Sequence, residues 1–337
     1  MSSFSSAQYA EAARAALDRL EPEMAADMAR RAVGASAATR DAAAAAEGQE
    51  LLAEALTALG EREGAAAAWR SSIAAAELVA PAAATVPQAE RWLYLAQLLG
   101  GREALEAFEH GAEMLDACAG SSSSAPSSAA AAAAAPAADA AASSSVDAQR
   151  IGARCALAEL WMTDLCDEDE AEARCEAAVA AAVAVGPRDP EALQALANLR
   201  VTQGRHAEAG AAMATAVDTM HSADATDARQ GLQATDAQFN FEARVSAARV
   251  LLECAGARAG ESDVGGGGVE AARAVEVVDA LLARDANVIE LWYVEGGGAA
   301  TAASTGCAPA PPAPTALPRA CYTCPTVLPL HCYCSYF

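Results

Sequence analysis

The residues with the most obvious chemical potential lie near the C-terminal end of the sequence. Cys321-x-x-Cys324 and His331-Cys332-x-Cys334 could together supply four ligands to a tetrahedral zinc ion. The second group lacks the usual spacing of a zinc site, and prolines crowd the segment. The sequence therefore favours an unstructured Pro/Ala/Cys-rich tail over residues 297–337, without a metal site.

A second candidate for chemistry is an acidic block between Glu159 and Glu176. It carries eight carboxylates against the single Arg174. Paired carboxylates can act as general acid and base, but no histidine or metal-ligand pattern accompanies them. Acidic residues just before a helix also favour its N-terminus, which accounts for most of the block without catalysis. We interpret the block as an acidic turn between two helices.

Other enzyme classes are excluded by missing residue types and motifs. All 22 basic residues are Arg, so no phosphate-loop, Schiff-base or Ser-x-x-Lys lysine exists. The chain has no Gly-x-Ser-x-Gly and no His-Glu-x-x-His, and its four histidines are scattered through the sequence. We predict that the protein is not an enzyme and needs no cofactor.

The charge balance indicates which partners the chain can bind. There are 45 acidic and 22 basic residues, a net charge of −23, and the pI is about 4.4. Such a field repels nucleic acid and attracts basic proteins. No apolar run resembles a membrane span, and no secretory signal is visible at the start. We therefore expect a protein of the cytoplasm and nucleus that binds a basic protein, with no direct contact to nucleic acid or membrane.

An internal repeat predicts the fold. In six segments an alanine is followed by another apolar residue four positions later. Two more positions, seven and eight residues after the alanine, complete the pattern. Spacings of four, seven and eight lie on one helical face, and five of the six residues at position seven are small. The pattern is typical of the second helix of tetratricopeptide repeats. The anchoring residues are Ala25, Ala65, Ala104, Ala171, Ala209 and Ala274.

First helices are expected before each anchor, which gives an all-α tetratricopeptide-repeat superhelical solenoid over residues 6–295. The anchors are spaced by more than the ideal period of about 34 residues. The excess lies in Ala-, Ser-, Pro- and Gly-rich stretches without a packing pattern. We predict a loop at 80–88 and disordered insertions at about 119–145 and 260–268. The expected first helices cover 7–20, 47–59, 90–99, 148–165, 190–203 and 240–255.

The groove side of such a solenoid is lined by its first helices, and this side is predicted to be acidic. In the second repeat the groove positions hold Glu47, Glu50, Glu54 and Thr57. In the fourth they hold Cys155, Glu159 and Met162, and in the fifth Glu191, Gln194, Asn198 and Val201. Solenoids bind partners along this side.

Three stretches resemble one particular tetratricopeptide family. They are Ala158-Glu-Leu-Trp-Met-Thr-Asp-Leu-Cys-Asp-Glu168, Asp189-Pro-Glu-Ala-Leu-Gln-Ala-Leu-Ala-Asn-Leu-Arg200 and Arg91-Trp-Leu-Tyr-Leu-Ala-Gln-Leu98. The chain is similar to the dedicated assembly chaperones of large-subunit ribosomal protein four, over about residues 6–296 without the insertions. The resemblance implies capture of that newly made protein through its long internal basic extension and escort to pre-60S assembly.

The most specific part of the resemblance is the string from Met162 to Glu168. Its matching positions are predicted partner contacts, together with the groove residues of three repeats. The predicted partner-binding residues are Glu47, Glu50, Glu54, Glu159, Trp161, Asp164, Asp167, Glu168 and Asn198. The alternative is a general tetratricopeptide scaffold for another complex. The carboxylate-clamp adaptors of heat-shock chaperones are disfavoured, because their groove needs Lys and this chain has none.

Overall fold

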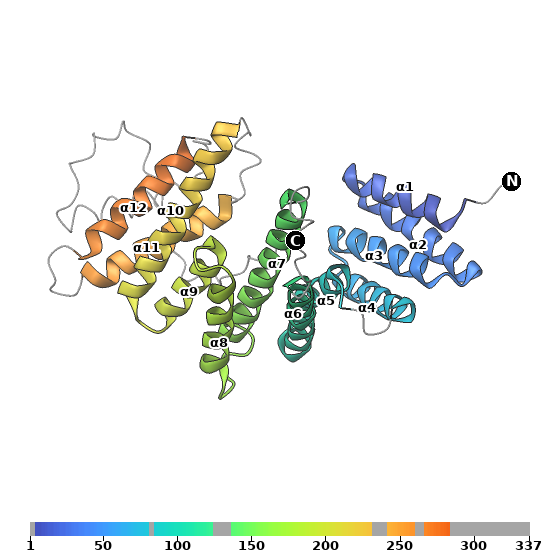
Figure 1. The fold of residues 1–337 in the computed structure, drawn as a ribbon, viewed down its shortest axis with the longest axis horizontal. Helices are drawn as coiled ribbons and strands as arrows, with labels where there is room; N and C mark the ends of the chain where they lie inside the picture. Colours follow the sequence, from blue (N-terminus) through green and yellow to red (C-terminus); the bar gives the residue numbers. More distant parts are fainter. Residues whose placement is uncertain (1–3, 81–83, 124–135, 231–240, 260–265, 284–337) are drawn as a thin grey trace, which may run out of the picture. The chain divides into compact units, whose positions relative to one another are not determined.

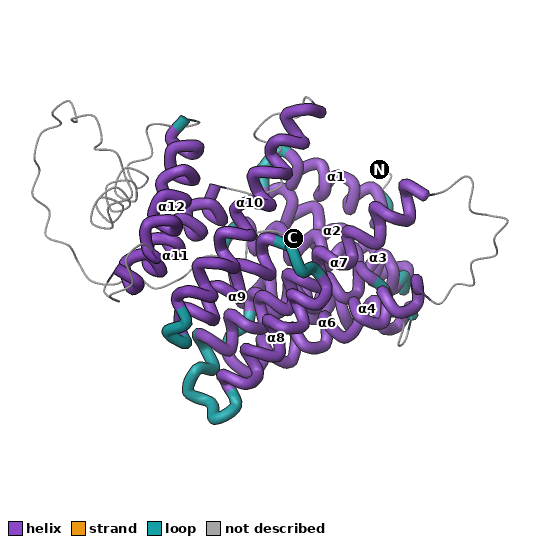
Figure 2. The backbone as a smooth tube through the Cα atoms, turned by 60° about the vertical axis from the view of Figure 1, so that its left-hand side comes forward, coloured by secondary structure: helices purple, strands orange, loops and turns teal. Residues whose placement is uncertain are grey.

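A computed structural model describes residues 4–80, 84–123, 136–230, 241–259 and 266–283. Every regular element in these ranges is an α-helix (Figures 1 and 2). The chain divides into two compact units, Met1–Arg174 and Cys175–Phe337. None of the described helices is both long enough and apolar enough to cross a membrane.

The first unit consists of helix pairs that pack in chain order. Each helix contacts the next one, and the first helix α1 also contacts the next first helix, α3. This sequential paired packing confirms the predicted all-α tetratricopeptide-type solenoid. The helices are α1 (Ser6–Asp18), α2 (Pro22–Thr39), α3 (Ala42–Ala58), α4 (Arg62–Val79), α5 (Val86–Leu98), α6 (Gly101–Ser123) and α7 (Pro136–Met162).

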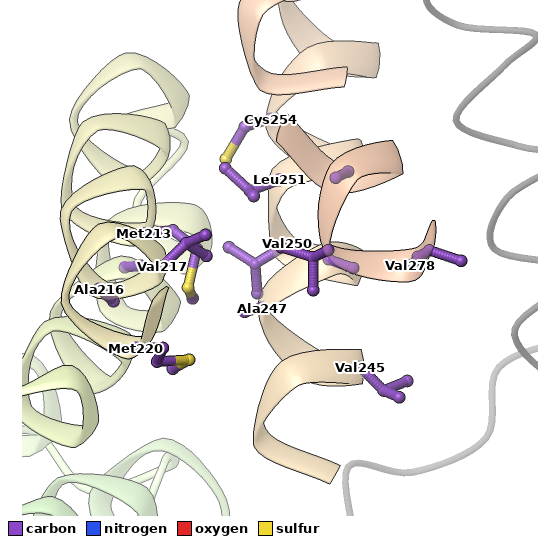
Figure 3. Close-up of a cluster of buried hydrophobic side chains, with 14 of the residues drawn as sticks. Met213, Ala216, Val217, Met220, Val245, Ala247, Val250, Leu251, Cys254 and Val278 are labelled. Atoms are coloured by element: carbon purple, nitrogen blue, oxygen red, sulfur yellow. The ribbon is translucent and has the colours of Figure 1, made fainter. Parts of the chain in front are cut away.

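The second unit repeats the same plan. Helix α9 packs on α10, α10 on α11 and α11 on α12, and the first helices α9 and α11 also touch. Figure 3 shows the core between them, in which Met213 and Val217 of α10 face Val250 and Leu251 of α11. The helices are α8 (Ala171–Val185), whose first turn belongs to the first unit, and then α9 (Pro190–Thr202), α10 (His206–Gln230), α11 (Phe241–Ala259) and α12 (Gly266–Leu282).

The alanine anchors of the sequence repeat are buried in all six second helices. The residues four positions later are buried as well, from Ala29 in α2 to Val278 in α12. Small residues mark the closest helix approaches. Ser72 in α4 donates a hydrogen bond from Oγ to the backbone carbonyl of Ala46 in α3, at 2.9 Å. The repeat pattern therefore identified the packing side of each second helix correctly.

Local sequence explains where several helices begin and end. Ser5 and Gln8 form a capping box at the start of α1, and Asp189 caps α9 ahead of a proline at its first position. Gly60 and Gly204 end the turns after α3 and α9 with positive φ of 75° and 71°. A left-handed residue at a helix end costs least when it is glycine.

Helix boundaries differ from the expected ones around the insertions. Helix α5 begins at Val86, so residues 86–88 of the predicted loop 80–88 are helical. Helix α6 runs to Ser123 and α7 starts at Pro136, so both ends of the predicted insertion 119–145 are helical. Helix α12 likewise covers 266–268. In α7 the helical part of the insertion is rich in alanine, which has the strongest intrinsic helix propensity and needs no burial pattern to continue a helix. The rest of both insertions and the tail 297–337 lie outside the described residues.

Substituting tryptophan for a buried alanine in the fifth repeat tests the packing. Ala197 in α9 and Ala209 in α10 are fully buried in one core cluster. Ala197→Trp or Ala209→Trp should lower the melting temperature, because overpacking costs about 1–3 kcal/mol or more. The matched control is Ala211→Trp, at an exposed position of α10. Equal melting temperatures for the buried and exposed variants would contradict the helix register.

Candidate protein-binding face

The three glutamates predicted for the groove of the second repeat share one face of α3. Glu47 and Glu50 are half-buried and Glu54 is exposed. Their spacings of three and four bring them to the same side of the helix. Glu47 pairs with Arg14 of α1, with 2.7 Å between Oε1 and Nη2. Glu50 Oε2 accepts hydrogen bonds from Arg91 Nη2 and Nε of α5, at 2.7 and 3.0 Å.

The same face continues onto the next first helices. Glu90 of α5 accepts a hydrogen bond from the Gln149 amide of α7, with 2.5 Å between Nε2 and Oε1. Polar contacts thus join α1 to α3, α3 to α5, and α5 to α7. We call this set the polar ladder, which consists of Arg14, Glu47, Glu50, Glu54, Glu90, Arg91, Tyr94 and Gln149.

The ladder carries more carboxylate than guanidinium, because four Glu face only two Arg. Burial raises the pKa of Tyr94, and the nearby charges of Glu90, Glu54 and Glu50 raise it further. The pKa of Glu54 is also raised, first by the desolvation that the surrounding helices impose and then by Glu50. Arg14 only partly offsets these effects. A cation placed among these groups would relieve both pKa shifts.

Glu54 is the residue of this face best placed for a partner. It is exposed, and it forms no ion pair among the residues that the structure describes. Glu47 and Glu50 are already held by arginines of neighbouring helices. These arginines orient the two carboxylates. Glu54, one turn after Glu50 on α3, keeps a negative charge that no arginine of the described ranges neutralises by an ion pair. The arrangement can accept guanidinium or ammonium groups.

Three residues of the motif from Trp161 to Glu168 make contacts within the fold. The Trp161 side chain is buried, with 8% exposure. Asp164 Oδ2 accepts a hydrogen bond from the backbone N–H of Gly101, at 3.0 Å, and Glu168 pairs with Arg102 at 2.7 Å. Both carboxylates therefore hold the N-terminus of α6, where unpaired N–H groups and the helix dipole favour negative charge. The structure gives Trp161, Asp164 and Glu168 intramolecular roles that the prediction of partner contacts did not include.

The other predicted site residues are dispersed. Asp167 is exposed in the turn after α7, and Glu159 is half-buried on α7. In the second unit, Asn198 is half-buried on α9. One turn before it on α9, Gln194 donates a hydrogen bond to Ser246 Oγ of α11 at 2.9 Å. Two turns before it, desolvation by its surroundings and then the charge of Asp189 raise the pKa of Glu191 to about 7. The second unit thus has its own polar face on α9 and α11.

Sequence reasoning missed Arg14, Glu90, Arg91 and Tyr94 as members of the face. A signal for the residues of α5 was present in Thr85-Val-Pro, a helix start with proline near its first position. The predicted helix 90–99 already held Glu90 and Tyr94 one turn apart on one face, but groove positions were not assigned in this repeat. Among the described residues, no cluster of His, Cys, Asp and Glu could hold a metal ion. The C-terminal Cys/His group lies outside them.

Comparison with solved structures bears on the identity of this helical array. The assembly chaperone of RpL4 (Acl4), residues 1–338, has a structure that matches with a TM-score of 0.66 and 26% sequence identity. The match covers 88% of this chain and 95% of that one. The chain is a homologue of the RpL4 assembly chaperones. The predicted family resemblance is confirmed, and so is the tetratricopeptide-like fold.

Sequence comparison points to the same family. A stretch of 146 residues, 43% of the chain, is 30% identical to the probable assembly chaperone of rpl4 of Schizosaccharomyces pombe. A stretch of 145 residues is 29% identical to the probable assembly chaperone of rpl4 of Emericella nidulans. The matched stretches span 37% and 32% of the length of these two relatives. No family model matches the chain.

Proposed function

We propose that this protein is an assembly chaperone of ribosomal protein RpL4 and holds a basic segment of that protein on the polar ladder. The homology to RpL4 assembly chaperones carries the proposal. The net charge of −23 supports it, because an acidic protein attracts a basic client. The proposed role is a binding role, without catalysis or a cofactor.

Physical chemistry explains what such a chaperone gains from this face. Ribosomal proteins carry Arg- and Lys-rich extensions that fold on RNA, and off the ribosome these bind nucleic acid unspecifically. An acidic protein attracts the extension over a distance and speeds the encounter. Carboxylates already oriented by Arg14 and Arg91 lose little side-chain freedom when a client guanidinium approaches. Such charge contacts give way to RNA phosphates, so release on pre-60S particles needs no hydrolysis step. The proposed route runs from cytoplasm to nucleus.

Charge reversal of Glu54 tests the proposal. Glu54→Arg should weaken binding of the RpL4 extension about three- to tenfold at low salt and reduce the salt dependence, because one steering carboxylate becomes a repelling cation. Titration calorimetry of the purified full chain with the extension, at low and moderate salt, measures both. Glu50 is unsuitable for reversal, because Glu50→Arg would set a second arginine against Arg91.

The matched control is Glu109→Arg, at an exposed position of the second helix α6. It makes the same change of net charge away from the ladder and should affect binding less. If Glu54→Arg and Glu109→Arg bind equally well, the ladder is not the client site. If the wild-type chain does not bind RpL4 and co-purifies with another protein complex, the scaffold function replaces the chaperone function.

A further inference from the structure

A groove between α4 and α6 borders α5 on the side of Trp92. Helices α4 and α6 both pack on α5, and the space between them has a volume of about 690 Å³. Ile73 and Leu95 form its buried floor, and Trp92 is half-buried in it. Trp92 lies two residues from both Glu90 and Tyr94, which is just over half a helical turn. Glu90 and Tyr94 therefore lie on the side of α5 opposite Trp92, whereas the ladder residue Arg91 borders the adjoining space next to Trp92.

The apolar part of the groove has the character of an anchor pocket. The Trp92 ring meets His110 of α6 edge-to-face, with 4.6 Å between the ring centroids. Ala107 and Leu99 extend the apolar wall. Aromatic and aliphatic side chains enclosed in this way are typical anchor sites of protein interfaces.

The rim of the groove is acidic. Arg70 of α4 pairs with Glu103 of α6 at 2.9 Å, so these two charges cancel. Glu77 of α4 and Glu106 of α6 also line the groove, and neither takes part in an ion pair among the described residues. Two exposed carboxylates thus flank an apolar floor from opposite walls. Directly after Glu77, α4 ends with Leu78 and Val79, which are 79% and 54% exposed.

We propose that this α4–α5–α6 groove is a second docking site, which binds a segment of a partner protein with an apolar side chain between arginine or lysine residues. The apolar side chain enters beside Trp92, and the flanking cations pair with Glu77 and Glu106. Charge complementarity identifies the occupant, because an acidic rim disfavours an acidic segment and an apolar floor disfavours a purely charged one.

A defined peptide tests the site on the full chain. The probe carries two leucines one helical turn apart, each flanked by arginines, and binding is followed by the NMR signal of the Trp92 indole N–H. Trp92→Phe assigns that signal among the four tryptophans. We expect a saturable shift of the Trp92 signal. Peptides with Leu replaced by Ser, or Arg replaced by Gln, should bind more weakly.

Matched variants separate the groove from general acidity. Glu77→Gln with Glu106→Gln should weaken peptide binding about three- to tenfold, because two exposed ion pairs are lost. Glu63→Gln with Glu109→Gln removes the same charge from exposed positions of α4 and α6 outside the groove and should leave binding unchanged. An unmoved Trp92 signal, or equal binding of the Leu→Ser peptide, would overturn the proposal. Because the assay contains no RpL4, its outcome is independent of the proposed chaperone function.

Discussion

Replacing Gly111 by leucine should destabilise the third helix pair by about 3 kcal/mol, at the upper end of overpacking costs. Gly111 lies in α6 where it crosses α5. A β-carbon there would stand 2.7 Å from Leu93 Cδ2 and 3.0 Å from Leu93 Cγ. Leu93 is fully buried, and the backbone carbonyl of Ala89 lies 3.3 Å away on the same side. A larger residue at this position therefore forces Leu93 or the helix backbone to shift.

Thermal unfolding measures this effect, with Gly120→Leu as the matched control. Gly120 is in the same helix, and nothing lies within 4 Å of its β-carbon position. Gly111→Leu should lower the melting temperature by about 6–12 °C for a unit of this size. Gly120→Leu should leave it unchanged or raise it slightly, because leucine is the better helix former. A similar melting temperature for both variants would show that α5 and α6 do not approach as closely as the structure has them.

Gly111 also illustrates why the helix pairs could be predicted from the sequence. It stands seven residues after Ala104, at the position where four of the other five repeats have Ala or Ser and the last has Leu281. Close helix packing favours small residues there, and the requirement recurs in most repeats. The buried face of each second helix could therefore be predicted from the local sequence.

The contacts between repeats were not predictable in the same way. Asp164 accepts from Gly101 across 63 residues, and Arg91 donates to Glu50 across 41. Nothing local distinguishes an aspartate that caps a distant helix from one that binds a partner. The match of the Met162–Glu168 string to a family indicated that these residues matter. It did not indicate whether they bind a partner or stabilise the fold. On α3, by contrast, spacing alone placed Glu47, Glu50 and Glu54 on one face, because residues three or four positions apart point to the same side of a helix.

Loss of Asp116 should have the second large effect on stability. Its carboxylate joins α6 to α7, where it accepts hydrogen bonds from Arg150 Nε at 2.8 Å and from Arg154 Nη2 at 2.5 Å. The Arg154 side chain is only 11% exposed and that of Arg150 22%. Asp116→Ala would leave both guanidinium groups partly buried and close together. Breaking a buried pair typically costs about 3–5 kcal/mol. Asp116 itself is 44% exposed, so we expect about 2 kcal/mol here.

Chemical denaturation of Asp116→Ala and Asp116→Asn, beside Glu113→Ala as control, measures this cost. Glu113 is an exposed carboxylate of the same helix. Asp116→Asn keeps the shape of the side chain and one acceptor oxygen. Its free energy of unfolding should therefore lie between those of Asp116→Ala and wild type. If Asp116→Ala matches Glu113→Ala, the cluster adds nothing to the docking of α7.

The same carboxylate predicts how wild-type stability depends on pH. Partial burial would raise the pKa of Asp116, but hydrogen bonds from Arg154 and then Arg150 outweigh it and hold the pKa below its ordinary value of 3.8. A folded-state pKa below the unfolded one means that the unfolded chain binds the proton more tightly. The contribution of Asp116 is then complete above about pH 4–5 and is lost as the pH falls through the folded pKa. Between pH 5 and pH 3, wild type should therefore lose more stability than Asp116→Asn, which has no proton to gain at this position. Parallel acid-dependent slopes for the two proteins would assign the acid sensitivity to other carboxylates.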